Sequence, residues 1–276
     1  MSTRTRSPLP VRAEVRRQLQ RRRTLVSFGL LLALPLILVG AFALGDGSGE
    51  DDPAPSFVDL AQVGAANFTV FTLFASTGFL LVVLVALFAG DAVPAEASWS
   101  SLRYLLTTPV PRVRLLTVKL AVALLTTLAA LVTLPAWCLA VGAVAYGTDP
   151  YRGPTGEQLA WGDFALRLLV IVGYLAVSLL FVAALAFLVG TVTDAPLAAV
   201  GSAVLVTIVS SILDTIEPLG AVREALPTHE QFAWADALQR EVAWAGMADG
   251  ALWALLWSTL LLTAAYVVFA RKDVLS

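Results

Sequence analysis

The side chains that could do chemistry are concentrated in one polar stretch, from Gly90 to Lys119, which lies between two strongly hydrophobic runs. Helical spacing places one polar set on a common face, namely Glu96, Ser100, Arg103 and Thr107. Trp99, Leu102 and Leu106 fall on the opposite face. A carboxylate, a guanidinium, two hydroxyls and an indole on a short helix can form ion pairs and packing contacts with another surface. The pattern predicts either a docking helix or a membrane-surface connector whose polar face is solvated.

Sequence signals limit this short helix at both ends. Pro94 suits a first helical turn and Asp91 lies just before it, whereas Pro109 and Pro111 end the pattern. Three basic side chains follow as the next hydrophobic run begins, and we expect them to reach lipid headgroups: Arg112, Arg114 and Lys119.

Other chemistries find little support. The single histidine, His229, has no Cys, Asp or Glu cluster at ligand spacing, so we predict a surface residue and no metal site. The lone Cys138 lies inside a hydrophobic run. The only lysines, Lys119 and Lys272, do not follow the Gly-rich run of a phosphate loop, and no Gly-x-Ser-x-Gly elbow occurs. We therefore predict no catalytic residue, no bound cofactor and no ATPase activity in this chain.

The elements that must position the polar stretch are membrane spans. The sequence is 58% hydrophobic and 14% charged, with a mean hydropathy of +0.83, which is typical of a polytopic membrane protein. A span needs about 20 apolar residues. We expect an all-α polytopic membrane protein, one transmembrane domain over residues 1–276, with six transmembrane helices near 24–44, 67–89, 118–146, 166–193, 196–214 and 250–270. Pro135 is expected to kink the third, and a turn at 193–196 joins the fourth and fifth into a hairpin.

Residues 1–23 contain eight arginines and a single acid, Glu14. Val11, Val15 and Leu19 recur every fourth residue, which predicts an amphipathic interfacial helix on an anionic membrane surface. Its basic side chains are Arg12, Arg16, Arg17 and Arg21. A disordered basic tail and a cleavable export signal are the alternatives. The apolar run that follows is longer than the 7 to 15 residues of a typical signal core, which favours an uncleaved first span.

Charge asymmetry predicts the orientation. With both termini, the stretch from Gly90 to Lys119 and the turn at Asp194 in the cytoplasm, the inside segments hold 14 of the 18 Lys and Arg. They hold only five of the 20 acids. Positive residues accumulate on the cytoplasmic side, so we predict a multi-pass protein of the cell inner or plasma membrane with cytoplasmic termini.

The external segment 217–249 has a pattern of its own. Thr228 and Gln231 are spaced as a capping box that would begin a short helix before the last span. Trp234, Leu238 and Val242 share one face of that helix. It is expected to rest in the outer interface, either as an amphipathic cover over the spans or as a gate.

The central portions of the predicted spans contain no Asp, Glu, Lys, Arg or His. Ion-coupled transporters and pumps place ionisable residues at membrane depth, because the coupling ion must be held there. Directional work by this chain would therefore need energy from another subunit.

Three motifs resemble parts of the ABC-2 type transporter permeases. The polar stretch carries Glu96, Leu105-Leu106, Thr108-Pro109-Val110, Arg112 and Lys119, like that family's cytoplasmic loop. Phe269 to Val274 is similar to the family's usual ending, and Leu226 to His229 with Trp234 to its external segment. Ser100, Ser101 and Pro111 depart from the common pattern, which bears on the local helix shape only.

The resemblance implies a permease subunit that pairs with separate ABC ATPase subunits, which would bind ATP and Mg²⁺. Two permease copies, as a homodimer or pseudo-dimer within membrane lipid, would form the pathway, with the second and fifth spans facing each other. Glu96, Trp99, Ser100, Arg103 and Thr107 would make up the coupling helix that docks on the ATPase. The cargo would be hydrophobic or amphiphilic and exported, and no nucleic-acid partner is expected. A non-transporting scaffold or assembly factor and a secondary carrier remain the alternative functions.

Overall fold

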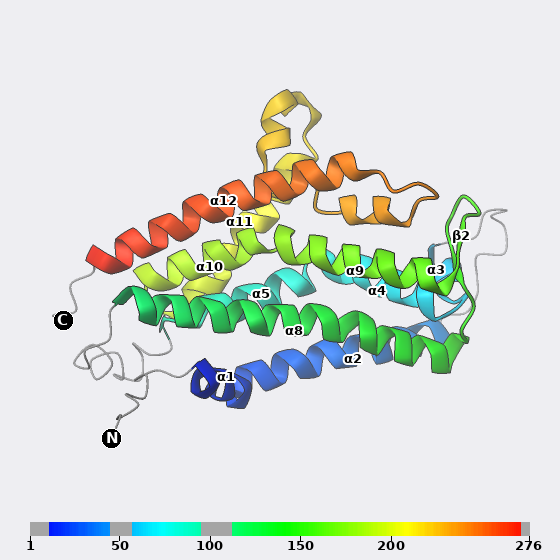
Figure 1. Cartoon of the computed structure of the whole chain (residues 1–276), viewed down its shortest axis with the longest axis horizontal. Coiled ribbons are helices and arrows are strands. Elements are labelled where there is room, and N and C mark those ends of the chain that lie inside the picture. Colours follow the sequence, from blue (N-terminus) through cyan, green and yellow to red (C-terminus); the bar gives the residue numbers. More distant parts are fainter. Residues whose placement is uncertain (1–10, 45–56, 95–111, 272–276) are drawn as a thin grey trace, which may run out of the picture.

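The computed structural model describes residues 11–44, 57–94 and 112–271, and these fold almost entirely into helices (Figure 1). Helix α1 (Val11–Gln20) precedes the first long helix, α2 (Arg22–Leu44). Further long helices are α8 (Arg112–Tyr146), α11 (Pro196–Asp214) and α12 (Trp244–Arg271). Helices α9 (Trp161–Ser178) and α10 (Leu180–Val192) together form one further span. The prediction of an all-α polytopic membrane protein is confirmed.

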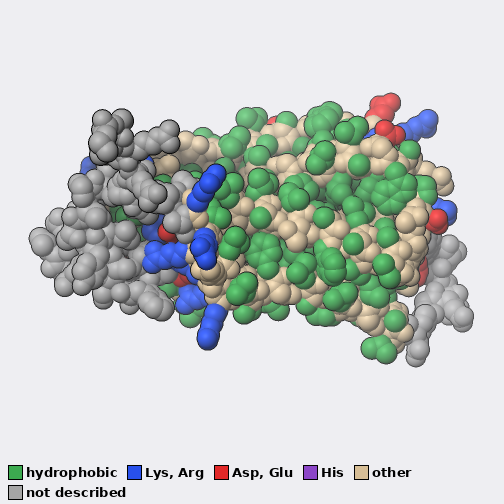
Figure 2. All heavy atoms as spheres, turned by 60° about the horizontal axis from the view of Figure 1, so that its bottom comes forward, with side chains coloured by type: hydrophobic (Ala, Val, Ile, Leu, Met, Phe, Trp, Pro, Cys, Tyr) green, Lys and Arg blue, Asp and Glu red, His purple; other side chains and the backbone are tan. Residues whose placement is uncertain are grey.

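Five helices within the described residues are long and apolar enough to cross a membrane. A sixth span results if α4 (Ala65–Thr77) and α5 (Leu80–Gly90) are counted as one, although these two helices are bent by 58° at their junction. The hydrophobic surface agrees with this reading, because on the face shown in Figure 2 hydrophobic side chains are spread over the middle of the body and charged ones lie towards its two ends. Lipid tails solvate such a surface where water would not.

The two ends of the bundle differ. One end, called here the α1 end, carries α1, the start of α8 and the end of α12 (Figure 1). The other, the hairpin end, carries α3 (Phe57–Ala61) and a small antiparallel hairpin of β1 (Tyr151–Arg152) and β2 (Gln158–Leu159). Helix α8 has 35 residues, so at 1.5 Å per residue it is about 52 Å long and extends beyond a hydrocarbon core of about 30 Å. It continues through Pro135 as one helix.

The break between α4 and α5 falls at Gly78 and Phe79. The backbone of Phe79 leaves the helical region, with φ −137° and ψ −60°. On the preceding turn, the hydroxyls of Ser76 and Thr77 donate to carbonyls four residues earlier, a pattern that often bends helices. The second span is therefore a pair of short helices, not the single continuous helix that hydropathy alone indicates.

Close helix packing at the α1 end depends on small residues. A Cβ atom on Gly190 of α10 would lie 2.9 Å from the carbonyl oxygen of Gly90 at the end of α5. A Cβ atom on Gly90 would lie 3.3 Å from side-chain atoms of Ala199 and Val200 on α11. Helix α5 is thus held between α10 and α11 by close backbone approach, as is common where helices associate in a membrane.

The segment between α11 and α12 contains two short 3-10 helices, η1 (Glu217–Ala225) and η2 (Ala233–Leu238). The predicted capping box does not form there. The hydroxyl of Thr228 pairs with that of Ser210 on α11 at 2.7 Å, and the amide of Gln231 donates to the carbonyl of Thr77 at 3.0 Å. These tertiary hydrogen bonds satisfy the two side chains, so the helix begins later, at Ala233, and it is short.

Candidate functional site

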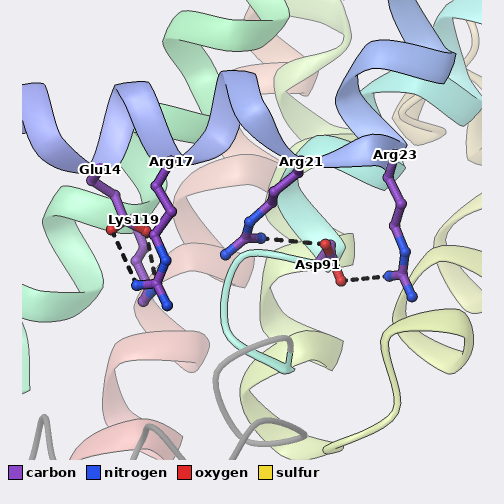
Figure 3. Close-up of polar contacts among 6 residues, drawn as sticks. All are labelled: Glu14, Arg17, Arg21, Arg23, Asp91 and Lys119. Carbon is purple, nitrogen blue, oxygen red and sulfur yellow. Dashed lines mark hydrogen bonds and ion pairs between the residues drawn. The ribbon is translucent and has the colours of Figure 1, made fainter.

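The predicted docking residues, Glu96, Trp99, Ser100, Arg103 and Thr107, lie outside the described residues. Both flanks of that segment are described, up to Pro94 after α5 and from Arg112 at the start of α8. Both flanks contact the amino-terminal helix α1 or the residues that join it to α2 through buried or partly buried ion pairs (Figure 3). The set of Glu14, Arg17, Arg21, Arg23, Asp91 and Lys119 is called here the ion-pair clamp.

Asp91 forms one half of the clamp. It directly follows the last residue of α5, where its N–H donates to the carbonyl of Leu87, and its side chain is only 8% exposed. Arg21 Nη1 lies 3.3 Å from Oδ2, and Arg23 Nη1 lies 2.6 Å from Oδ1. Burial raises the pKa of Asp91, while the positive charges of Arg23 and Arg21 act in the opposite direction. Asp91 therefore ends α5 and anchors two arginines; Pro94 is helical, and the rest of the helix expected after it lies outside the described residues.

Lys119 and Glu14 form the other half. Lys119 Nζ lies 3.1 Å from Glu14 Oε1, and the two side chains are 3% and 9% exposed. Arg17 approaches the second oxygen of Glu14 at 3.8 Å, from the same helix. The expectation that Lys119 reaches lipid headgroups is wrong. Its ammonium instead meets a carboxylate 105 positions earlier in the chain, which offsets part of the cost of burying both charges.

The clamp connects four helices around the ends of the 95–111 segment. Asp91 follows the last residue of α5 and Lys119 lies in the third turn of α8, while Glu14 belongs to α1, Arg23 belongs to α2 and Arg21 is the residue that joins them (Figure 3). Such ion pairs carry out no bond chemistry. They hold α1, α5 and α8 in fixed relative positions, because moving one of these helices separately would break a buried ion pair.

Helix α1 presents its faces differently from the simple apolar pattern. Glu14 and Gln18 are buried, so its polar face packs on the bundle. Arg12 and Arg16 are exposed, and Leu19 is 50% exposed. Of the four arginines predicted for the interfacial basic helix, Arg21 points into the clamp, and Arg17 lies beside Glu14. Sequence reasoning missed Glu14 and Asp91 as functional candidates, although Glu14 is an isolated acid within a strongly basic segment, which is a usable signal.

At the level where α11 ends, a second polar cluster holds the segment that contains η1 and η2. His229 Nδ1 lies 2.5 Å from Asp214 Oδ1 on α11, and Arg223 Nε lies 3.5 Å from the same oxygen. Tyr174 of α9 donates to the carbonyl of Glu230. His229 is thus a partly buried pairing residue, and its partner Asp214 could not be inferred from spacing alone. Among the described residues, no group of three or more metal-ligating side chains occurs.

A small cavity lies beside this cluster. Its volume is about 20 Å³, and its lining includes Val82, Tyr174, Ser178, Leu179, Thr228 and Glu230. That volume suits about one water molecule. The cavity lies where the segment meets α9 and α10, and it is too small for an organic cargo.

Comparison with known proteins identifies the family of this chain. The sequence model of the family described as ABC-2 family transporter protein matches residues 11–274. No curated protein matches the chain. The matched range includes all members of the ion-pair clamp, the segment 95–111 and the external segment before α12.

Proposed function

Because the chain belongs to the ABC-2 family of transporter proteins, we propose that it is a permease subunit that exports a hydrophobic or amphiphilic molecule with energy from ATP hydrolysed by partner subunits. Membership of this family makes the chain a membrane transport component and implies partnership with an ABC ATPase. ATP and Mg²⁺ would bind to that partner.

The observation that carries the proposal is the ion-pair clamp. It joins α1 to both ends of the 95–111 segment, through Asp91 on one side and Lys119 on the other. In the proposed mechanism, the ATPase contacts this segment through Glu96 and Arg103, with Trp99 for packing. A displacement imposed there reaches α5 and α8 together, because the clamp resists their separation.

The bent second span supplies an element that could respond. Helix α5 has only 11 residues between the break at Gly78 and Phe79 and its anchored end at Asp91. A short rigid helix between a break and an anchor can rotate about the break. ATPase dimerisation would shift α5 from one orientation to another and so switch access between the two sides of the membrane.

Two copies of the chain are proposed to form the pathway, with the second and fifth spans facing each other. Gly78 and Phe79 are both exposed on the single chain, and Phe79 is 61% exposed. Irregular backbone at membrane depth is tolerated where protein or a water-filled path covers it, and lipid cannot satisfy it. A second copy would provide that cover.

The cargo follows from what the spans contain. Their central portions have no Asp, Glu, Lys, Arg or His in the sequence, so a fixed-charge site for an ion or a highly charged solute is not favoured. An apolar or amphiphilic molecule fits such a path. Basic residues favour a cytoplasmic α1 end, which would place the ATPase there and the hairpin end outside.

The test is reconstitution with the ATPase that co-purifies with the chain. We expect the wild-type chain to change the ATPase turnover and to support ATP-driven export of a hydrophobic dye from vesicles. The double variant Glu96→Arg, Arg103→Glu should lose both, and the matched pair Arg152→Glu, Glu157→Arg on the hairpin side should keep both. Normal binding and transport by the first variant would refute the docking role.

Two outcomes would favour other functions. Transport by the isolated chain under an ion gradient, without ATP, would identify a secondary carrier. A co-purifying partner whose turnover is unaffected, together with no movement of any cargo, would identify a membrane scaffold.

A further inference from the structure

We propose that the outward face of α1 and the start of α2 bind anionic lipid headgroups of the leaflet on the α1 side, and that this contact sets the position of the ion-pair clamp. The binding surface consists of Arg12, Arg16 and Leu19 on α1 with Arg22 at the start of α2. The effect of the lipid on the clamp rests on the proposed function, whereas lipid binding itself does not.

Opposite sides of α1 have different tasks. Glu14 and Gln18 are buried against the bundle, and Arg21 follows on the same side at helical spacing. Arg12, Arg16 and Leu19 are spaced at i, i+4 and i+7, so they share the face that points away from the bundle. All three are exposed, Leu19 to 50%. The helix therefore presents two guanidinium groups and one large apolar side chain together.

The start of α2 indicates how deep this face lies. Leu25, Val26 and Leu30 are 60%, 61% and 57% exposed, as expected of side chains in contact with lipid tails. Arg22 is less than one helical turn before Leu25, and a turn of helix rises about 5.4 Å. The exposed arginines are thus at headgroup depth, while Leu19 continues the apolar surface of α2 on α1.

The charge of this face is of one sign. The only acid of residues 1–23 is Glu14, and it is buried beside Lys119. Figure 2 brings the side of the molecule with α2 and α8 forward, and basic side chains gather there at the α1 end of the hydrophobic body. Each arginine at an anionic surface strengthens binding about fivefold, so removal of two should weaken it about 30-fold.

The occupant that fits both features is a bilayer surface. A soluble phosphate would neutralise the guanidinium groups but would leave Leu19 in water. An anionic bilayer accommodates both, because its headgroups pair with the arginines while its acyl region receives the leucine.

Lipid binding on the outer face would act on the clamp through the same helix. The inward face of α1 carries Glu14, and Arg21 follows at its junction with α2, and these side chains hold Lys119 and Asp91. An anionic leaflet that draws α1 towards the headgroups therefore fixes the two ends of the 95–111 segment. Anionic lipid is expected to increase the coupling of the partner ATPase to this chain.

The experiment compares the full-length wild type with the double variant Arg12→Gln, Arg16→Gln. The matched control is Arg152→Gln, Arg240→Gln, which removes two exposed arginines near the hairpin end and its loops. In each protein, spin-labelled phosphatidylglycerol and phosphatidylcholine report the relative association constants of the two lipids with the protein surface. We expect a preference for phosphatidylglycerol in the wild type and the control, reduced about 30-fold at the arginine sites of the test variant.

Equal phosphatidylglycerol preference in all three proteins would overturn the lipid site. So would displacement of the lipid by soluble glycerol phosphate, because that would indicate an anion site and not a membrane surface. Loss of the ATPase from the test variant in neutral phosphatidylcholine alone would show that this face binds the ATPase, and it would also overturn the proposal.

A second readout addresses regulation. ATPase turnover in discs with and without phosphatidylglycerol should depend on the anionic lipid in the wild type and not in the test variant. If the preference for phosphatidylglycerol falls in the test variant while the response of ATPase turnover to this lipid is unchanged, the lipid does not control the ion-pair clamp. If no ATPase associates with the wild type while lipid preference is intact, the proposed function fails and the lipid site stands.

Discussion

Replacing Lys119 with Met is expected to destabilise the protein strongly, because it leaves the Glu14 carboxylate buried opposite an apolar side chain. The side chains of Lys119 and Glu14 are 3% and 9% exposed, so water can replace little of the lost interaction. Removing one partner of a buried pair costs about 3–5 kcal/mol. Replacing both, as Glu14→Leu with Lys119→Met, also removes the buried carboxylate and should restore most of that loss.

The assay is a double-mutant cycle on the purified protein in lipid discs, followed by thermal unfolding. A loss of 1 kcal/mol corresponds to about 2 °C for a chain of this size, so the Lys119→Met variant should melt about 6–10 °C lower. The double variant should recover at least half of that shift. The control is Arg152→Met at the hairpin, whose ion pair with Asp149 has side chains 51% and 62% exposed. Its effect should stay below about 2 °C, because exposed pairs contribute about 0–1 kcal/mol.

Two results would refute the reasoning. If Lys119→Met has the same melting temperature as the control variant, the ion pair of Lys119 with Glu14 does not stabilise the folded protein. If the double variant is no more stable than the single one, the loss comes from packing around Lys119 and not from the carboxylate that has lost its lysine.

Three further predictions concern the break, a helix crossing and the external segment. Gln231→Leu removes the donor to the Thr77 carbonyl, and we expect faster hydrogen exchange in α4 near the break; unchanged exchange would argue against that contact. Gly142→Leu should lower expression of folded protein sharply, since a Cβ atom at Gly142 lies 2.9 Å from the α4 backbone, and a normal melting temperature would contradict the close crossing. Burial raises the pKa of Glu230 above its ordinary value of 4.5, so the folded state favours the protonated carboxyl. This contribution to stability is fully present below pH 4.5 and is lost as the pH rises through the pKa of the folded state. The melting temperature of Glu230→Gln relative to wild type should therefore increase from pH 4.5 upward, and a constant difference would refute the shift.

Hydropathy and charge were sufficient for the class of fold. Uncharged runs of about 20 residues can only be buried in lipid as helices, because no other open structure satisfies its own backbone there. The 193–196 turn and the loops likewise follow from local composition. These properties depend on neighbouring residues, so they can be inferred from the sequence alone.

The polar stretch from Gly90 to Lys119 shows where such inference ends. Local rules interpreted its two ends as a signal preceding a helix at Asp91 and a headgroup contact at Lys119, and neither rule indicates a tertiary partner. The structure instead pairs Asp91 with Arg21 and Arg23, and Lys119 with Glu14, across separations of 68 to 105 residues. Spacing rules carry no information about partners that far apart in the chain.

The break in the second span and the course of the external segment have the same origin. Thr228 and Gln231 form a good local capping pattern, but Ser210 and Thr77 lie close enough to compete for their side chains. By itself, the sequence determined that this chain is a helical membrane protein, which of its segments are polar, and on which side of the membrane its basic residues are expected to lie. Only the tertiary structure decided which charges are buried together and where a span bends, because desolvation makes those choices only after the helices have packed.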